Sequence, residues 1–246
     1  MLDTAKAWLR DILHTLAPAI AAGTPVVGLE PSCVAVFRDE LTQLFPEDED
    51  AKRLASQAYL LSEFLQQKVP DFEYPTLHAE ALVHGHCHHR AVMKMDAQER
   101  VLDAVGLAHH ELDAGCCGMA GSFGFERDHY DISMTIGERV LLPAVRNAAK
   151  EVLIVADGFS CREQIAQGTD RQALHLAEVL EMATRDHPAR VADRYPERTY
   201  RPDHGRIAIL SLREVAIAGV GMFAAGAAVW SICRLVGATL STSRSS

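Results

Sequence analysis

Four short apolar segments, each followed within a few residues by cysteine, constrain the fold of this 246-residue chain more than any other feature. The segments are 24–29, 81–84, 107–112 and 152–156, and stretches with helical periodicity separate them. Strands that alternate with helices predict an α/β fold with a mainly parallel sheet and flanking helices. The carboxyl ends of parallel strands share one edge of the sheet, where ligands bind. The sequence therefore predicts that the cysteines gather at that edge.

The spacing of apolar residues also predicts the helices between these strands. They are expected over 1–22, over 32–44 with Ser32 as the cap, over 51–67, over 91–105, over 132–149 with an interruption or a bend at Pro143, from Ser160 onward, and over 171–183.

The pair Cys116-Cys117, set among glycines, is expected to bind a metal together with Cys87 and Cys161. Neighbouring side chains point in different directions, so both thiols of the pair cannot easily serve the core. Thiolates are soft ligands suited to iron–sulfur clusters and zinc. The spacing lacks the C-x₂-C pair of zinc fingers and the closely spaced run of ferredoxins.

Cys33 is expected to be a further cofactor-binding residue, because it closes a weak internal repeat. Residues 25–33 and 153–161 share an apolar strand, a three-residue turn and Ser-Cys at a helix start. The second copy ends the cysteine constellation, yet the first has no earlier cysteines. We therefore expect the sequence to begin inside a longer protein or to be one piece of a split one. Cys233 lies in an apolar run and is expected only to pack.

Histidines 84, 86, 88 and 89 surround Cys87, and His86 and His88 stand closest to the thiol in sequence. Near a metal they could hydrogen-bond to sulfur, supply protons or act as ligands; the alternative is that some cap a helix and others face solvent. His109 and His110 alternate along a strand, so at most one faces the site. The glycines at 118, 121 and 124 are expected to let backbone N–H groups approach bridging sulfides.

Composition excludes several functions. A formal net charge of −9 disfavours a nucleic-acid partner, which requires clustered Lys and Arg. Six cysteines without a leader-like N-terminus indicate a reducing compartment. The chain has no G-x-G-x-x-G loop, G-x-S-x-G elbow or P-loop.

These motifs carry a family resemblance. Cys87, Cys116-Cys117-Gly118 and Cys161 resemble the cysteine-rich CCG domain found in heterodisulfide reductase and in the iron–sulfur subunits of glycolate oxidase and anaerobic glycerol-3-phosphate dehydrogenase. The residues around these cysteines are most similar to those of FAD-linked 2-hydroxyacid dehydrogenases of the D-lactate or glycolate type. The resemblance covers about residues 1–183.

The resemblance implies an electron-transfer module with a [4Fe-4S]-type cluster, which takes electrons from FAD on another domain or partner. The acceptor would be a quinone, a cytochrome or a disulfide. Gly158 and Gln164 occupy the positions three before and after Cys161, where the heterodisulfide reductase pattern ends in Cys-x-x-Cys, which leaves four cysteines as ligands. The flavin domain is absent from the sequence, so this chain alone is not expected to oxidise a substrate.

The resemblance divides the first part of the chain into a remnant of a first CCG repeat (1–70) and a CCG iron–sulfur domain (71–186). Charge and hydrophobicity divide the rest into a basic linker (187–212) and a candidate transmembrane helix (213–238). Residues 215–233 carry no charge and approach the roughly 20 residues that span a bilayer. They are either a membrane anchor or a soluble packing helix. More arginines precede this segment than follow it, so an anchor would hold the rest of the chain at the cytoplasmic face of the membrane.

Two other functions remain open at this point. The chain could be a degenerate scaffold or binding fragment without a cluster. It could also be a thiol enzyme or hydrolase that uses Cys87 with a neighbouring histidine, although no orienting acid is identifiable.

Overall fold

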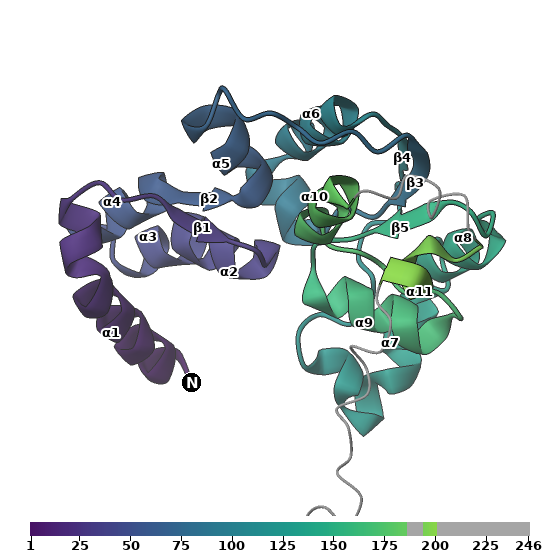
Figure 1. The fold of residues 1–246 in the computed structure, drawn as a ribbon. Helices are drawn as coiled ribbons and strands as arrows, with labels where there is room; N and C mark the ends of the chain where they lie inside the picture. The colour runs from purple at the N-terminus through teal and green to yellow at the C-terminus, as the bar shows by residue number, and fades with distance from the viewer. Residues whose placement is uncertain (186–193, 201–246) are drawn as a thin grey trace, which may run out of the picture. The chain divides into compact units, whose positions relative to one another are not determined.

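Two parallel sheets organise the chain in the computed structural model, which describes residues 1–185 and 194–200 (Figure 1). In the first sheet β1 pairs with β2, and in the second the strand order is β4-β3-β5. All pairings are parallel, and helices flank both sheets. The predicted α/β class is confirmed.

The elements follow one another in chain order as Figure 1 labels them. They are α1 (Leu2–Ala21), β1 (Val26–Gly28), α2 (Pro31–Ala35), η1 (Val36–Glu40), α3 (Leu41–Leu44), α4 (Glu49–Gln57), β2 (Ala58–Leu60), α5 (Leu61–Lys68), β3 (Ala79–Val83), η2 (His89–Met93), α6 (Asp96–Val105), β4 (Leu107–Glu111), η3 (Phe123–Phe125), η4 (Arg127–His129), α7 (Tyr130–Gly137), α8 (Leu141–Asn147), β5 (Leu153–Val155), α9 (Phe159–Gly168), α10 (Leu176–Thr184) and α11 (Pro196–Tyr200).

Residues 1–68, here called the first lobe, form a small core around the amphipathic helix α1. Leu9, Leu13 and Ile20 of α1 pack with Leu41 and Leu54. The predicted helix over 1–22 is confirmed, and no side chain caps its N-terminus. The Ser32 cap is wrong: Glu30 is the N-cap of α2, and its carboxylate accepts from the Ser32 N–H.

The single helix predicted over 51–67 is also wrong, because β2 separates α4 from α5. Tertiary contacts satisfy the backbone at the break. The guanidinium of Arg38 donates to the Ala58 carbonyl (2.8 and 3.0 Å), and the Glu63 carboxylate accepts from the Leu60 N–H (2.8 Å). Pairing with β1 then holds residues 58–60 extended. Helical periodicity across this segment does not reveal these distant partners.

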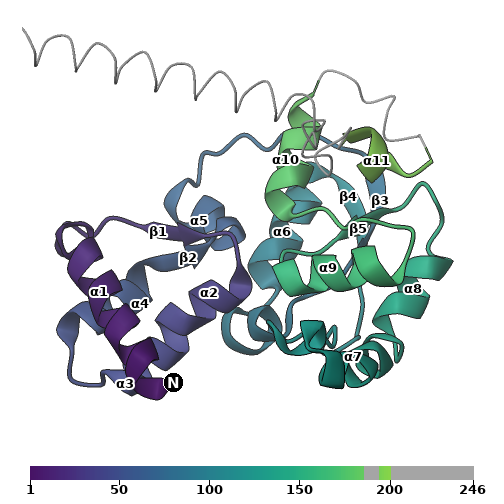
Figure 2. The same ribbon diagram turned by 90° about the horizontal axis from the view of Figure 1, so that it is seen from below.

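Residues 77–185 and 194–200, here called the second lobe, enclose the three-stranded sheet between two layers. On one face Val101 of α6 and Val179 of α10 pack against the sheet, and on the other Val145 of α8 and Ile165 of α9 do so. Figures 1 and 2 show α6 and α10 beside each other, with α8 on the far side of the strands. The carboxyl ends of β3, β4 and β5 therefore open between layers of packed helix.

Two predicted helices of this lobe are divided. The helix over 91–105 is split into η2 and α6 at Lys94, whose positive φ of 70° a right-handed helix does not contain. The predicted interruption of the helix over 132–149 is confirmed, but it falls between α7 and α8, from 137 to 141. Pro143 does not cause it, because Pro143 sits in the first turn of α8, where proline is tolerated.

The helix predicted from Arg171 begins only at Leu176, because residues before it extend along the sheet edge. Leu174 forms a parallel bridge with Val155, and His175 caps α10 by accepting from the Ala177 N–H (2.9 Å). Arg171 is fully buried and turns inward to Glu197 of α11 (2.6 Å). Its guanidinium also donates to the Val152 carbonyl, so this ion pair fastens α11 to the start of β5.

The internal repeat is confirmed and extends beyond the predicted residues. In both copies a strand leads through a short turn into a helix whose third residue is a cysteine, Cys33 in α2 and Cys161 in α9. Val27 then pairs with Tyr59 just as Val155 pairs with Leu174. At the start of the next helix in each copy, a glutamate side chain accepts from the N-cap N–H: Glu63 accepts from Leu60, and Glu178 accepts from His175.

The predicted basic linker (187–212), the candidate transmembrane helix (213–238) and Cys233 lie outside the described residues, except for 194–200. Within residues 1–185 and 194–200, no helix is long and apolar enough to cross a membrane. The domain division at residue 70 stays a prediction; the described residues, 1–185 and 194–200, belong to one compact unit.

Candidate functional site

Three neighbouring strands deliver the four central cysteines to one edge of the second sheet. The chain leaves β3 through His84, whose N–H donates to the Val155 carbonyl (2.8 Å), and reaches Cys87. It leaves β4 through Leu112, whose N–H donates to the Val83 carbonyl (2.8 Å), and reaches Cys116 and Cys117. β5 leads into the first turn of α9, which holds Cys161.

The four thiols form one continuous group. Cys87 interacts with Cys116, Cys116 with Cys117, and Cys117 with Cys161. No disulfide joins them, and all four are free. Cys117 and Cys161 are buried, whereas Cys87 and Cys116 are half-buried. The group therefore reaches from the interior to the surface.

Mutual hydrogen bonding divides the group into two thiolates and two thiols. The Cys116 sulfur accepts hydrogen bonds from Cys117, from Cys87 and from the Gly118 N–H (3.3 Å). Together these bonds lower the pKa of Cys116 to about 2. Hydrogen bonds from Cys117 and from the His84 ring lower the pKa of Cys161 to about 5. The same bonds, with burial, raise the pKa values of Cys87 and Cys117. A metal that takes all four sulfurs would displace about two protons at neutral pH.

These pKa directions give a labelling prediction. In the metal-free chain we expect Cys116 to react with iodoacetamide faster than Cys33 at about pH 6, because its thiolate is formed and half-exposed. Its rate should change little up to about pH 8. Burial and the nearby Glu30 carboxylate raise the pKa of Cys33, so its rate should rise about tenfold per pH unit. Mass spectrometry of timed digests measures both, and Cys33 reacting first at pH 6 would contradict this assignment.

Gly158 leaves space that a side chain would take from His86 and Cys161. A Cβ at this position would lie 2.3 Å from His86 Cδ2 and 3.2 Å from Cys161 Sγ. Of the glycines expected to approach sulfides, only Gly118 donates to a sulfur. A Cβ at Gly118 or Gly124 would instead meet Ser133 of α7, so these two glycines bring α7 against the cysteine loop. Gly121 has nothing within 4 Å of its Cβ position.

Buried imidazoles surround the sulfurs. His84 and His89 are 2% and 1% exposed. The His84 ring acts on the Cys161 sulfur, whereas neither nitrogen of His89 reaches a partner with hydrogen-bond geometry among the described residues. Burial lowers the pKa of His89, which keeps that ring neutral. Unpartnered buried polar atoms are costly, so the His89 ring indicates a group that the protein atoms do not supply.

The two histidines predicted as best placed differ from each other. His86 is buried, and its Nδ1 accepts from the His88 N–H (3.2 Å), whereas His88 is exposed. Ligand atoms of His86, Cys87 and His88 lie within 4.8 Å of one another. The sequence did not favour His84 or His89 over the other two histidines. The alternation of His84 and His86 after β3 is a signal that could have placed these two rings near the edge of the sheet.

Cys33 is not among the interacting thiols. It is exposed in the first turn of α2, and Glu30 is the charged group that acts on it. Its role as a cofactor-binding residue stays a prediction.

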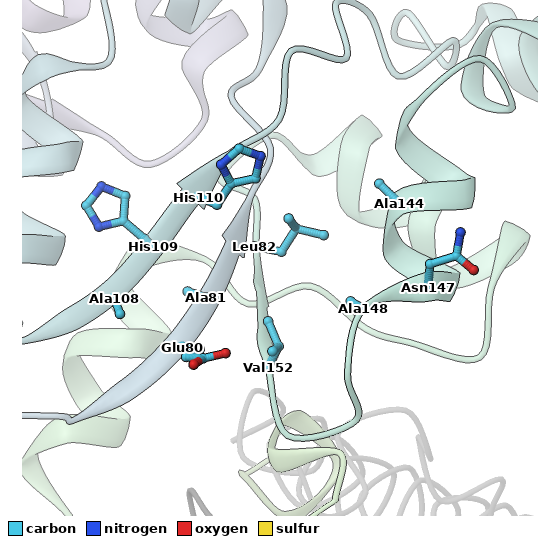
Figure 3. Close-up of a pocket in the computed structure, with 10 residues that line it drawn as sticks. All are labelled: Glu80, Ala81, Leu82, Ala108, His109, His110, Ala144, Asn147, Ala148 and Val152. Carbon is cyan, nitrogen blue, oxygen red and sulfur yellow. The ribbon is translucent and has the colours of Figure 1, made fainter.

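A hollow of about 530 Å³ is lined by residues of β3, β4 and α8 and by Val152, which precedes β5 (Figure 3). Leu82 and His110 of the strands face Ala144 and Asn147 of α8 across it, and no cysteine lines it. His109 and His110 thus belong to this hollow and not to the cysteine site.

The donor set fits a cysteine-ligated group. Four thiols from three strand ends, a glycine that leaves space beside Cys161, a His84 ring that acts on the Cys161 sulfur and an unpartnered His89 ring together suit an iron–sulfur cluster or a zinc ion.

Comparison with known proteins relates the chain to oxidoreductases. It is 29% identical over 178 residues to D-2-hydroxyglutarate dehydrogenase of Pseudomonas putida (72% of this chain, 17% of that protein) and 30% identical over 161 residues to that of Pantoea ananatis (64% and 15%). It is 27% identical over 165 residues to one of the subunits of anaerobic glycerol-3-phosphate dehydrogenase of Escherichia coli K12 (65% and 41%). The chain thus matches less than half the length of each relative. No family model and no solved structure matches it.

Proposed function

We propose that the chain is an iron–sulfur electron-transfer module related to the dehydrogenases it resembles. One observation carries this proposal: Cys87, Cys116, Cys117 and Cys161 meet as one group of free thiols at the carboxyl ends of three parallel strands. The names of the relatives support an oxidoreductase role, and one of them is part of a larger dehydrogenase. Membership in the CCG family is part of the proposal.

The four cysteines would hold the cluster, of [4Fe-4S] type, which supplies one-electron transfer when bound. Cys117 and Cys161 anchor it on the inner side, because both are buried. Cys87 and Cys116 are half-buried and form the side that a redox partner can approach. The His84 imidazole acts on the Cys161 sulfur and favours its thiolate.

A fifth cysteine ligand has no place in this site. Gln164 is buried and donates from its side-chain amide to the Ser133 carbonyl (3.2 Å), which fixes α7 against α9. Residue 158 must be small, because a Cβ there would lie 2.3 Å from His86 Cδ2 and 3.2 Å from Cys161 Sγ. These two positions support the helices around the four thiols, so the proposal is a four-cysteine cluster.

The partners belong to the proposal as well. The electron donor would be a flavin-containing dehydrogenase domain or subunit that carries FAD, and the acceptor a quinone, a cytochrome or a disulfide. Membrane attachment through residues 215–236, with the described lobes on the cytoplasmic side, is also proposed from the sequence alone.

Anaerobic reconstitution tests the cluster. The wild-type chain is expected to take up about four iron and four sulfide per chain, and to give a paramagnetic resonance signal after reduction. The Cys116→Ser/Cys117→Ser variant should bind close to none. The proposal gives Cys33 no part in this cluster, because its thiol is exposed and outside the group of four, so Cys33→Ser should keep the wild-type content; a lower content would add Cys33 to the ligands.

Three outcomes count against this proposal. An undiminished cluster in the double variant would remove the assigned ligands. Tight binding of one zinc by a chain that takes up no iron and sulfide under the same conditions would make the site a structural metal centre, and no binding at all would leave a scaffold without a cluster.

A further inference from the structure

Glu30 connects the two lobes at the helix that carries Cys161. Its Oε1 accepts from the hydroxyl and the N–H of Ser32 in its own helix (2.8 and 3.3 Å). Its Oε2 accepts from the N–H of Phe159, the first residue of α9 (2.6 Å). One carboxylate thus caps two helices, each with a cysteine as its third residue.

The internal repeat shows why α9 takes its cap from another lobe. Glu30 and Gly158 occupy equivalent positions, since both are the N-cap residue two before Ser-Cys. A first turn without a side-chain cap leaves N–H groups unsatisfied. Gly158 has no side chain to offer, and a larger residue would press on His86 and Cys161 Sγ. Because the site needs space beside the sulfur, residue 158 has no side chain that could cap α9. The Glu30 carboxylate accepts from the Phe159 N–H instead.

A second bond holds the same turn in place. His175 Nδ1 accepts from the Ala177 N–H (2.9 Å), so the hydrogen of the neutral ring is on Nε2, which donates to the Leu29 carbonyl (2.7 Å). Leu29 and Glu30 thus bind the starts of α10 and α9. The turn after β1 is fixed at two points, which leaves the Glu30 carboxylate little freedom to move away from Phe159.

We propose that Glu30 is a positioning residue for the sulfur site: from the first lobe it fixes the first turn of α9 and, with it, the place of Cys161. The effect on a cluster rests on the proposed function, but the effect on the turn does not. The first lobe would accordingly be required for a stable site even though none of the four central thiols comes from it.

The test compares Glu30→Ala, Glu30→Gln and Glu47→Gln. Glutamine keeps an amide oxygen that can accept from Phe159, whereas alanine keeps none. Glu47 is exposed in the same lobe and serves as the matched control for the loss of charge. Circular dichroism first establishes that each variant folds.

In the reconstituted chains, Glu30→Ala is expected to lose iron to a chelator at least about tenfold faster than wild type, the scale of a lost outer-shell partner. Its paramagnetic resonance spectrum should change, and Glu30→Gln should recover most of both properties. A Glu30→Ala chain with the spectrum and iron loss of Glu47→Gln would overturn the proposal.

Hydrogen exchange of the metal-free chains separates this inference from the proposed function. The Phe159 N–H should exchange about tenfold faster in Glu30→Ala than in Glu47→Gln, because it loses its acceptor. If wild type binds no cluster, the proposed function fails, and faster exchange at Phe159 still supports the positioning role. Unchanged exchange overturns it whether or not a cluster binds.

Discussion

Glu197→Gln is expected to destabilise the fold by about 3–5 kcal/mol, because it leaves the Arg171 guanidinium charged and unpaired in the interior. The two side chains are 2% and 0% exposed and meet at 2.6 Å. Arg171 also donates to the Ala149 and Val152 carbonyls, which holds the guanidinium in place after the carboxylate is lost. Urea unfolding followed by circular dichroism measures the change.

A matched control exists in the same lobe. Arg146 and Glu138 form an equally short pair (2.6 Å), but both side chains are about 40% exposed. Glu138→Gln should leave the unfolding midpoint nearly unchanged, since water screens this pair. Equal effects of the two substitutions would show that burial of the Arg171 pair does not matter. Replacing Arg171 and Glu197 together by Met and Leu should cost less than Glu197→Gln alone, because no charge is left buried.

The second sheet and its cysteines were predictable because their signals are local. β5 is a continuous apolar run, and its three residues are fully buried between two layers of helix. Parallel pairing then places Cys87, Cys116, Cys117 and Cys161 at a common edge. Neither step requires knowledge of a distant contact.

The split of residues 51–67 and the cap of α9 were not predictable for the opposite reason. Residues 58–60 are extended only because β1 and Arg38 satisfy their backbone. Glu30 is 129 residues from its partner Phe159, and the sequence gives no sign of that pairing. The repeat identified Cys33 and Cys161 as equivalent, but the difference between Glu30 and Gly158 acquires meaning only when both helix starts are seen together.

The buried histidines illustrate the same limit at the site. Four histidines around Cys87 made a functional role plausible, and proximity to the thiol in sequence favoured His86 and His88. Burial selects differently: His88 is exposed, whereas His84 and His89 lie inside. The turn after β3 decides which ring faces inward, and the start of that turn is held by the end of β5, through the His84 N–H bond to the Val155 carbonyl.

Gly158→Ala is expected to weaken metal binding by about 10–100-fold while the chain still folds. The φ of Gly158 is −66°, which any residue adopts, so the substitution tests space alone. The added Cβ would lie 2.3 Å from His86 Cδ2 and 3.2 Å from Cys161 Sγ, so the ring or the thiol must move. Competition with a chromophoric chelator for Zn²⁺, which thiolates bind without sulfide, measures the affinity.

Two comparisons isolate the cause of that loss. Gly115→Ala changes a glycine next to Cys116 whose Cβ position has nothing within 4 Å, so it carries only the cost of a positive φ and should bind metal more tightly than Gly158→Ala. In a His86→Ala background the ring is gone, and Gly158→Ala should then have a much smaller effect, because the two substitutions act on one contact. Full additivity of the two would place the clash elsewhere, at Cys161 itself, and would remove His86 from the support of the sulfur site.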